Sequence, residues 1–174
     1  MKQTIVFGGG CFWCTEAVFE MMKGVTKTEP GYAGGHKANP TYQEVCADTT
    51  GHAEVLKIEY ETDKIGFETL LEIFFTMHDP TTPNRQASDV GSQYRSIILC
   101  STQKQKKEAE EYIGKIRKDF DKLIITEIGE LDKFYPAEDY HKRYYDKNPL
   151  QPYCLFVTRP KVDKIRKKFK EYMK

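Results

Sequence analysis

Three consecutive glycines, Gly8 to Gly10, are the feature that most constrains how this chain folds. Residues 4–7 before them are mostly β-branched or aromatic, which favours a buried strand, and the glycines predict a tight turn. From Cys11 to Lys23 the apolar residues repeat at helical spacing, and Gly24 stands where a helix ends. The sequence therefore predicts a strand, a turn and a helix that begins at Cys11.

The rest of the chain continues this alternation. Apolar and charged residues alternate over 56–60, which indicates a half-exposed strand, and an apolar stripe over 67–77 indicates a helix. The other predicted elements are strands at 25–32, 94–100 and 123–128, helices at 102–120, 137–146 and 161–174, and a polar loop at 81–93. Two successive strand–helix–strand units predict an α+β fold: a two-layer sandwich with a ferredoxin-like split β-α-β core, a mostly antiparallel sheet and extra helices.

The length of 174 residues predicts a single domain over 1–174. We expect its core to span about 4–130, followed by a C-terminal segment, 131–174, that ends in a basic helix. The lysine-rich face of that helix is interpreted as a solvated surface rather than a membrane-binding or nucleic-acid-binding one. No repeat, low-complexity tract or linker interrupts the chain.

The 27 basic and 26 acidic residues nearly balance, so composition predicts no nucleic-acid partner and no membrane partner. The apolar stretch at the N-terminus is too short for a signal peptide or a membrane span, which favours a cytoplasmic protein, expected to be a monomer. Five cysteines, an odd number, do not resemble a secreted disulfide framework. Each cysteine is therefore expected to be buried, metal-bound or catalytic.

Cys11 is the first candidate for chemistry. At a helix N-terminus its sulfur faces unpaired backbone N–H groups and the positive end of the helix dipole, which lowers the pKa of a thiol. The preceding glycines let a substrate approach the backbone closely. On these residues alone, a reactive thiolate and a small buried apolar residue are equally good interpretations of Cys11.

Two other functions fit the same segment. Cys11-Phe12-Trp13-Cys14 has the Cys-x-x-Cys spacing of a general disulfide oxidoreductase. A zinc-binding module needs two more clustered ligands, but the remaining cysteines and the histidines show no paired spacing, so we predict no metal site. These isolated residues are Cys46, Cys100, Cys154, His36, His52, His78 and His141.

Gly-Gly-Cys-Phe-Trp-Cys after an N-terminal strand resembles the peptide methionine sulfoxide reductase A family. Further similar segments follow in the family's order, as far as about Cys154. They are 31–35 (Gly-Tyr-Ala-Gly-Gly), 39–46 (Asn-Pro-Thr-Tyr-Gln-Glu-Val-Cys), 50–54 (Thr-Gly-His-Ala-Glu), 78–80 (His-Asp-Pro), 91–96 (Gly-Ser-Gln-Tyr-Arg-Ser), 135–141 (Tyr-Pro-Ala-Glu-Asp-Tyr-His) and 152–154 (Pro-Tyr-Cys).

The resemblance implies a reaction in which the Cys11 thiolate attacks the sulfur of a sulfoxide. Negative charge then develops on the sulfoxide oxygen, so a proton donor and hydrogen-bond donors are needed there. Glu54 is the implied acid, which requires burial to raise its pKa. Tyr42 and Tyr94 are the implied hydrogen-bond donors. The implied substrate-binding residues are Phe12 and Trp13, as an aromatic floor for the methyl group, and Asp89, as an orienting carboxylate.

The resemblance also implies how the enzyme recycles. A sulfenic acid left on Cys11 condenses with a second thiol to form a disulfide. Cys154 is the first choice, in a segment expected to be mobile, and Cys14 is its rival, although a bond within one helical turn is expected to need unwinding. Cys46 and Cys100 are expected to be buried, inert thiols.

The implied function is a peptide-methionine (S)-S-oxide reductase that acts on methionine sulfoxide in proteins and as the free amino acid. Thioredoxin, or a reductant like dithiothreitol, is the implied electron donor, and no metal, flavin or nucleotide cofactor is needed.

Overall fold

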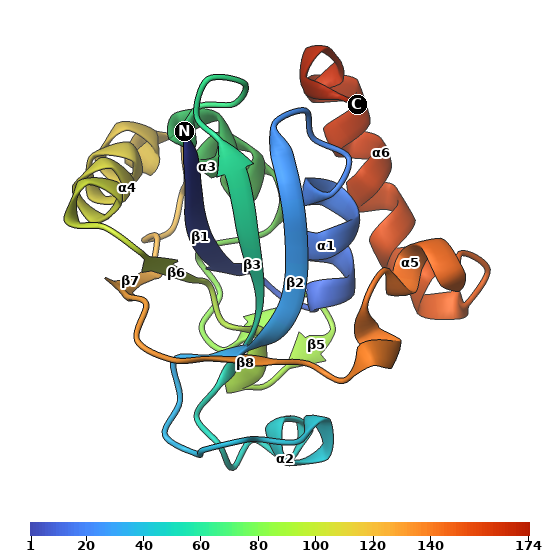
Figure 1. The fold of residues 1–174 in the computed structure, drawn as a ribbon. Coiled ribbons are helices and arrows are strands. Elements are labelled where there is room, and N and C mark those ends of the chain that lie inside the picture. The colour runs from blue at the N-terminus through green and yellow to red at the C-terminus, as the bar shows by residue number, and fades with distance from the viewer.

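The computed structural model describes all residues, 1–174, and is built around a six-stranded sheet in the order β7-β6-β1-β3-β2-β8 (Figure 1). All neighbouring strands in it are antiparallel except β6 and β7. The strands are β1 (Lys2–Gly8), β2 (Val25–Ala33), β3 (Ala53–Glu61), β6 (Ile97–Cys100), β7 (Glu127–Glu130) and β8 (Phe134–Pro136). A separate hairpin pairs β4 (Arg85–Gln86) with β5 (Asp89–Val90).

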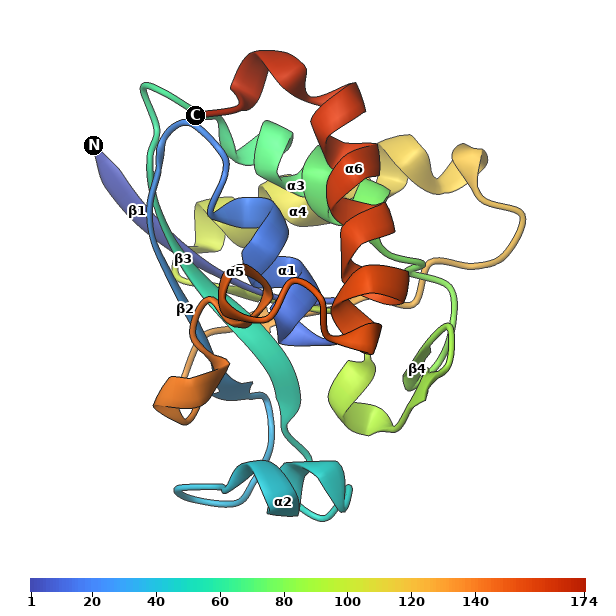
Figure 2. The same cartoon turned by 90° about the vertical axis from the view of Figure 1, so that its right-hand side faces the viewer.

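Helices cover one face of this sheet. Helix α1 packs on β2 and β3, α6 lies outside α1 and α3, and α4 lies beside α3 (Figure 2). The helices are α1 (Phe12–Phe19), α2 (Tyr42–Cys46), α3 (Phe67–Met77), α4 (Gln103–Ile116), α5 (Tyr144–Lys147) and α6 (Arg159–Lys168). Short 3₁₀ turns, among them η1 (Ser92–Tyr94), complete the structure.

The strand order confirms the predicted ferredoxin-like core. The unit β1-α1-β2 leaves a gap between its two parallel strands, and β3 fills that gap. The second unit, β3-α3-β6, places β6 on the far side of β1. Two interleaved units of this kind make the split β-α-β arrangement, with its mostly antiparallel sheet.

Alternation along β3 decides which side chains face the helices. Leu56 and Ile58 belong to the main apolar core between the sheet and the helices, whereas Val55 belongs to a smaller cluster on the opposite face, where Phe134 packs. Because side chains in a strand alternate, Glu54 falls in the same series as Leu56. Glu54 therefore points toward the layer that contains α1.

Several predicted boundaries differ from the observed ones. Helix α1 ends at Phe19 and not at Lys23. The strand predicted at 123–128 begins at Glu127, because the N–H of Ile125 donates to the Pro80 carbonyl instead of to a strand. The helix predicted at 137–146 is a 3₁₀ turn followed by α5, and the strand predicted at 94–100 begins at residue 97, after η1.

Helix α2 was not predicted, although its sequence contains a start signal. Thr41 and Glu44 form a capping box: the hydroxyl of Thr41 accepts the N–H of Glu44 at 3.3 Å, and the carboxylate of Glu44 accepts the N–H of Thr41 at 2.9 Å. Such a pair satisfies two backbone donors at a helix start. It fixes a five-residue helix whose first residue is Tyr42.

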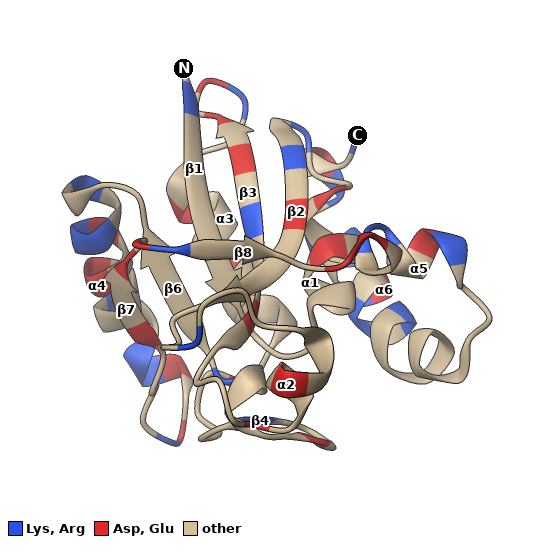
Figure 3. Ribbon diagram, turned by 60° about the horizontal axis from the view of Figure 1, so that its bottom comes forward, with Lys and Arg blue, Asp and Glu red and all other residues tan.

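Charged residues of both signs are interspersed on the outer surface, for example along α4 (Figure 3). Several form exposed pairs, such as Lys115 with Glu68 at 2.9 Å, which contribute little to stability. No helix combines the length and the apolar character that crossing a bilayer requires.

Candidate active site

Cys11 lies between β1 and α1, directly after the glycine turn. Gly10 takes φ = +97°, a conformation that favours glycine, and Cys11 itself is the extended N-cap of the helix, with φ −63° and ψ 129°. The residue is 7% exposed, and the backbone N–H of Trp13 is directed at the thiol and lowers its pKa. The predicted placement at the helix N-terminus is confirmed, and the residue keeps a small solvent-exposed fraction.

The predicted lowering of the Cys11 pKa is wrong. Burial raises the pKa of the thiol well above its ordinary value, and the charges of Glu54 and Cys14 raise it further, whereas the Trp13 N–H lowers it. Desolvation of a thiolate outweighs one backbone hydrogen bond and the dipole of an eight-residue helix. The free site therefore favours the neutral thiol, and its ionisation is coupled to the carboxyl of Glu54.

Glu54 comes from the start of β3 and is 1% exposed. Burial raises its pKa to about 8, which confirms the predicted shift, although the backbone N–H of Phe12 opposes it. Neither carboxyl oxygen has a partner in full hydrogen-bond geometry. At neutral pH this side chain is an uncharged acid that still holds its proton, and its charge does not oppose thiolate formation at Cys11.

Two tyrosines approach Cys11 and Glu54 from elements outside the sheet. Tyr42 is presented by α2, and Tyr94 ends the 3₁₀ turn η1. Burial raises the pKa of both phenols, and the charges of Glu54 and Cys11 raise them further, so each hydroxyl stays protonated as a donor. Asp48 joins the two regions, because its carboxylate accepts hydrogen bonds from the N–H and the hydroxyl of Ser92.

Aromatic rings surround the first turn of α1. The indole of Trp13 stacks on Tyr144 with ring centroids 3.7 Å apart and meets Tyr153 edge-on at 5.7 Å. Phe12 lies fully buried, with its ring centroid 4.9 Å from that of His141. The predicted aromatic floor is thus assembled from α1 and from residues more than 120 positions later in the sequence.

Asp89 lies on β5 at the edge of this group. Its carboxylate accepts a hydrogen bond of 2.6 Å from the hydroxyl of Tyr153. Its charge also raises the pKa of Cys11 and of Glu54, which places it near both. The structure therefore brings together all the residues predicted for sulfoxide attack and substrate binding.

The other thiols are arranged differently from what the sequence suggested. Cys154, which was predicted to lie in a mobile segment, is fully buried at the start of a π-helical turn, Cys154–Thr158, that runs into α6. Cys46 is exposed rather than buried, because Val45 is the only fully buried residue of α2. Cys100 is buried on β6, as predicted, and burial raises its pKa to about 11.

Comparison with known proteins explains this arrangement. Residues 3–173 match the family model described as peptide methionine sulfoxide reductase. The chain belongs to this reductase family.

Similar proteins cover nearly the whole chain. "Peptide methionine sulfoxide reductase MsrA" of Sulfolobus acidocaldarius is 55% identical over 167 residues, which are 96% of this chain and 95% of that protein. The protein of the same name from Trichodesmium erythraeum is 52% identical over 171 residues, 97% of each chain. The family predicted from the sequence motifs is therefore confirmed.

Solved structures agree with the fold. Methionine sulfoxide reductase A of Corynebacterium diphtheriae has a TM-score of 0.83 and 36% identity, and the match covers 86% of this chain and 76% of that one. Reduced Mxr1 from Saccharomyces cerevisiae also has a TM-score of 0.83, with 33% identity over 88% of this chain and 89% of that one.

Three further residues of this reductase site had no role assigned from the sequence. His141 and Tyr153 lie in the family-like segments 135–141 and 152–154, which was a usable signal. Tyr144 lay outside them, and nothing in the sequence marked it as the stacking partner of Trp13.

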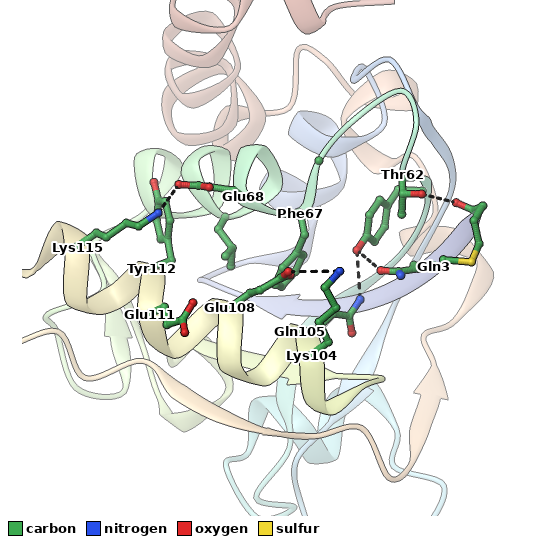
Figure 4. Close-up of a pocket in the computed structure, with 14 residues that line it drawn as sticks. Gln3, Thr62, Phe67, Glu68, Lys104, Gln105, Glu108, Glu111, Tyr112 and Lys115 are labelled. Atoms are coloured by element: carbon green, nitrogen blue, oxygen red, sulfur yellow. Dashed lines mark hydrogen bonds and ion pairs between the residues drawn. The ribbon is translucent and has the colours of Figure 1, made fainter.

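A pocket of about 510 Å³ at the N-terminal end of β1, between α3 and α4, is separate from the reductase site (Figure 4). It contains none of the predicted site residues, and its buried polar groups satisfy one another: Tyr60 donates to Gln3 at 2.9 Å, and Gln105 donates to Tyr60 at 3.2 Å. No group of three or more histidines, cysteines or carboxylates is placed to hold a metal ion.

Proposed function

We propose that this chain is a peptide-methionine (S)-S-oxide reductase in which Cys11 is the nucleophile and Glu54 the acid, within one catalytic domain. The observation that supports it best is the pairing of a slightly exposed thiol with a buried, uncharged carboxyl beside an aromatic wall. A sulfoxide carries a polar oxygen and an apolar methyl group on one sulfur, and the two halves of this site match those two substituents.

In the first step, the Cys11 sulfur attacks the sulfoxide sulfur. The methyl group lies against Phe12 and Trp13, which fixes the orientation of the sulfur. Glu54 gives its proton to the oxygen and takes up the proton that the Cys11 thiol loses, while Tyr42 and Tyr94 donate hydrogen bonds to the developing charge. Because Glu54 is protonated before the substrate arrives, it contributes a proton rather than a repulsive charge.

In the second step the sulfoxide oxygen is transferred to Cys11 as a sulfenic acid, and methionine leaves as a thioether. A further thiol of the chain condenses with the sulfenic acid, giving a disulfide and water. We propose thioredoxin as the dithiol that reduces this disulfide, in a cytoplasmic setting, with no other cofactor. A solved structure of Saccharomyces cerevisiae Mxr1 in complex with Trx2, a relative of this fold, is consistent with such a partner.

Separated S and R epimers of a methionine sulfoxide peptide, incubated with the protein and dithiothreitol or thioredoxin, test this function. We expect methionine from the S epimer alone, and no product from Cys11→Ser. Cys100→Ser is the matched control, because Cys100 is a buried thiol outside the site, and it should retain full activity.

The alternative general disulfide oxidoreductase predicts a different result in the same assay. Reduction of insulin disulfides that needs both Cys11 and Cys14, with no methionine formed from either epimer, would overturn the proposed reductase.

A further inference from the structure

Glu16 is a buried carboxyl group that the proposed reaction does not use. It lies on α1, three residues after Trp13, and is 2% exposed. One carboxyl oxygen accepts the backbone N–H of Arg143 at 2.8 Å, and the other accepts the hydroxyl of Thr28 on β2 at 3.2 Å. Burial of a carboxyl group is unfavourable unless its oxygens are hydrogen-bonded. The bond to Arg143 therefore fastens the C-terminal segment to α1.

Arg143 has an unusual backbone conformation. Its dihedral angles, φ 52° and ψ 39°, lie in the left-handed region, which is unfavourable for a residue with a Cβ. Its guanidinium lies at the surface, where it pairs with Asp146 at 2.7 Å, and such exposed pairs contribute little to stability. The backbone N–H, in contrast, is directed at the buried carboxyl group of Glu16. That hydrogen bond therefore stabilises the left-handed conformation.

The residues on either side of Arg143 hold the indole of Trp13. The indole N–H donates to Nδ1 of His141, and the ring of Tyr144 stacks on the indole. Because Arg143 lies between these two residues in the chain, its conformation decides whether both can contact the indole together. The turn at Arg143 thus shapes one wall of the pocket proposed for the methyl group of the substrate.

The bond to Glu16 is the backbone connection between this turn and α1. The N–H groups of His141, Lys142 and Lys147 donate to carbonyls of the same segment. Helix α5, which begins directly after Arg143, packs on α1 (Figure 2). Without the carboxyl group, the N–H of Arg143 would be left without an acceptor at a part-buried position, which is unfavourable for a backbone donor. We therefore expect the turn to shift when Glu16 is replaced by a residue without an acceptor.

We propose that Glu16 is a positioning residue for Trp13 and acts through the backbone N–H of Arg143. By fixing that N–H, it keeps His141 and Tyr144 in contact with the indole. The inference rests on the reductase function proposed above, because it assigns Glu16 to the pocket that orients the substrate. Glu16 contacts no reacting atom in this scheme. Its position requires an acceptor oxygen rather than a negative charge.

Three substitutions separate the acceptor from the charge. Glu16→Leu removes both oxygens and keeps a buried side chain of similar size. Glu16→Asp keeps the charge but withdraws the oxygens by one methylene group. Glu16→Gln keeps an acceptor for Arg143, and its amide can donate to the hydroxyl of Thr28. We expect Glu16→Gln to behave like wild type and the other two variants to release the turn.

Steady-state kinetics on a methionine sulfoxide peptide measures the effect on the substrate. In Glu16→Leu and Glu16→Asp, KM should rise about 5- to 10-fold, as for one lost hydrogen bond. The value of kcat should stay close to that of wild type, because Cys11 and Glu54 are unchanged. A mere loss of folded protein would instead lower the apparent kcat and leave KM unchanged. Glu16→Gln should keep the wild-type KM.

Fluorescence gives a readout that does not depend on catalysis. Trp13 is the only tryptophan of the chain, so its emission reports on this pocket alone. In Glu16→Leu and Glu16→Asp the emission maximum should shift to longer wavelength, and acrylamide should quench the emission more strongly, because a loosened indole is more exposed to water. Glu16→Gln should keep the wild-type spectrum.

Gln105→Leu is the matched control for the loss of a buried hydrogen bond. Gln105 is 2% exposed on α4, where its amide donates to the carbonyl of Thr4 at 3.0 Å and to the hydroxyl of Tyr60 at 3.2 Å. This variant should melt at a lower temperature than wild type, but its KM and its emission spectrum should not change.

The outcomes separate this inference from the reductase function. Wild-type KM and emission in Glu16→Asp overturn the positioning role even if Glu16→Leu does not fold, and so does a Glu16→Gln variant that loses substrate affinity as Glu16→Leu does. Equal changes in Gln105→Leu overturn it as well. No methionine from wild-type protein overturns the reductase function instead, and the emission spectra then still decide whether Glu16 holds Trp13.

Discussion

The indole N–H of Trp13 donates a hydrogen bond of 3.0 Å to Nδ1 of His141. Because Nδ1 accepts, the neutral ring carries its proton on Nε2, which is buried and has no partner in the structure. The His141 ring also lies 4.4 Å, between centroids, from the ring of Tyr42. The Trp13–His141 hydrogen bond and the His141–Tyr42 ring contact therefore connect the aromatic residue on α1 to the phenol on α2.

We expect His141→Phe to weaken substrate binding, because the ring is kept but the acceptor for Trp13 is lost. The ratio kcat/KM should fall about 5- to 10-fold, mostly through KM, as for one lost hydrogen bond. Steady-state kinetics on a methionine sulfoxide peptide measures this. Tyr140→Phe, at the exposed neighbouring residue, is the control, and equal kinetics for both variants would argue against the anchoring role of His141.

Glu54→Gln should reduce kcat about 10²- to 10⁴-fold, since an amide cannot give up a proton to the sulfoxide oxygen. In wild type the acid form exists below the Glu54 pKa of about 8, so activity should decline as pH rises through that value. The residual activity of Glu54→Gln should lack this decline. A pH profile of kcat/KM from pH 5 to pH 10 is the measurement, and a decline that persists in the variant assigns it to another group.

The same substitution should make Cys11 easier to ionise. The Glu54 charge raises the pKa of the Cys11 thiol, so its removal should move the midpoint of iodoacetamide alkylation to lower pH while reductase activity falls. Glu16→Gln is the matched control, because Glu16 is an equally buried carboxyl that does not act on Cys11. Loss of activity without a shift of the alkylation midpoint would show that the two groups are not coupled.

Burial of Glu54 should also appear in the stability of the protein. The folded-state pKa is raised above the ordinary value of 4.5, so burial of this carboxyl does not lower the free energy of unfolding below pH 4.5. Above pH 4.5 the loss of stability grows until the pH reaches about 8. Glu54→Gln should match wild type at pH 4 and exceed it in free energy of unfolding at pH 8, by on the order of 3 kcal/mol. Urea denaturation at both pH values tests this, and a difference of equal size at both would refute it.

Replacing each of two glycines by alanine should have opposite effects on the stability of the protein. A Cβ on Gly31 of β2 would lie 2.3 Å from the Phe134 ring and 2.5 Å from the Tyr135 carbonyl oxygen, so Gly31→Ala should destabilise by roughly 2 kcal/mol or more. Gly114 lies inside α4 with nothing near its Cβ position, so Gly114→Ala should stabilise by about 0.5 to 1 kcal/mol. Thermal denaturation of both variants should show melting shifts of opposite sign.

The local pattern of the sequence was enough to predict much of the fold. The alternation in residues 56–60 fixed the faces of β3, and the glycine turn placed Cys11 at the start of α1. Both patterns depend on backbone geometry over a few residues, which is why they can be read without the fold. The capping box at Thr41 and Glu44 is the same kind of local signal for α2.

Long-range contacts decided the rest of the site. The stacking of Tyr144 on Trp13, and the position of Cys154 beside Cys14 rather than Cys11, depend on how the C-terminal segment packs across α1, which no local pattern encodes. The pKa of Cys11 was mispredicted for the same reason: the helix dipole can be read from the sequence, but desolvation depends on residues that only the fold brings together. The sequence by itself determined which groups are present and where the helix starts, whereas the tertiary structure decided which groups are shielded from water and which thiols are neighbours.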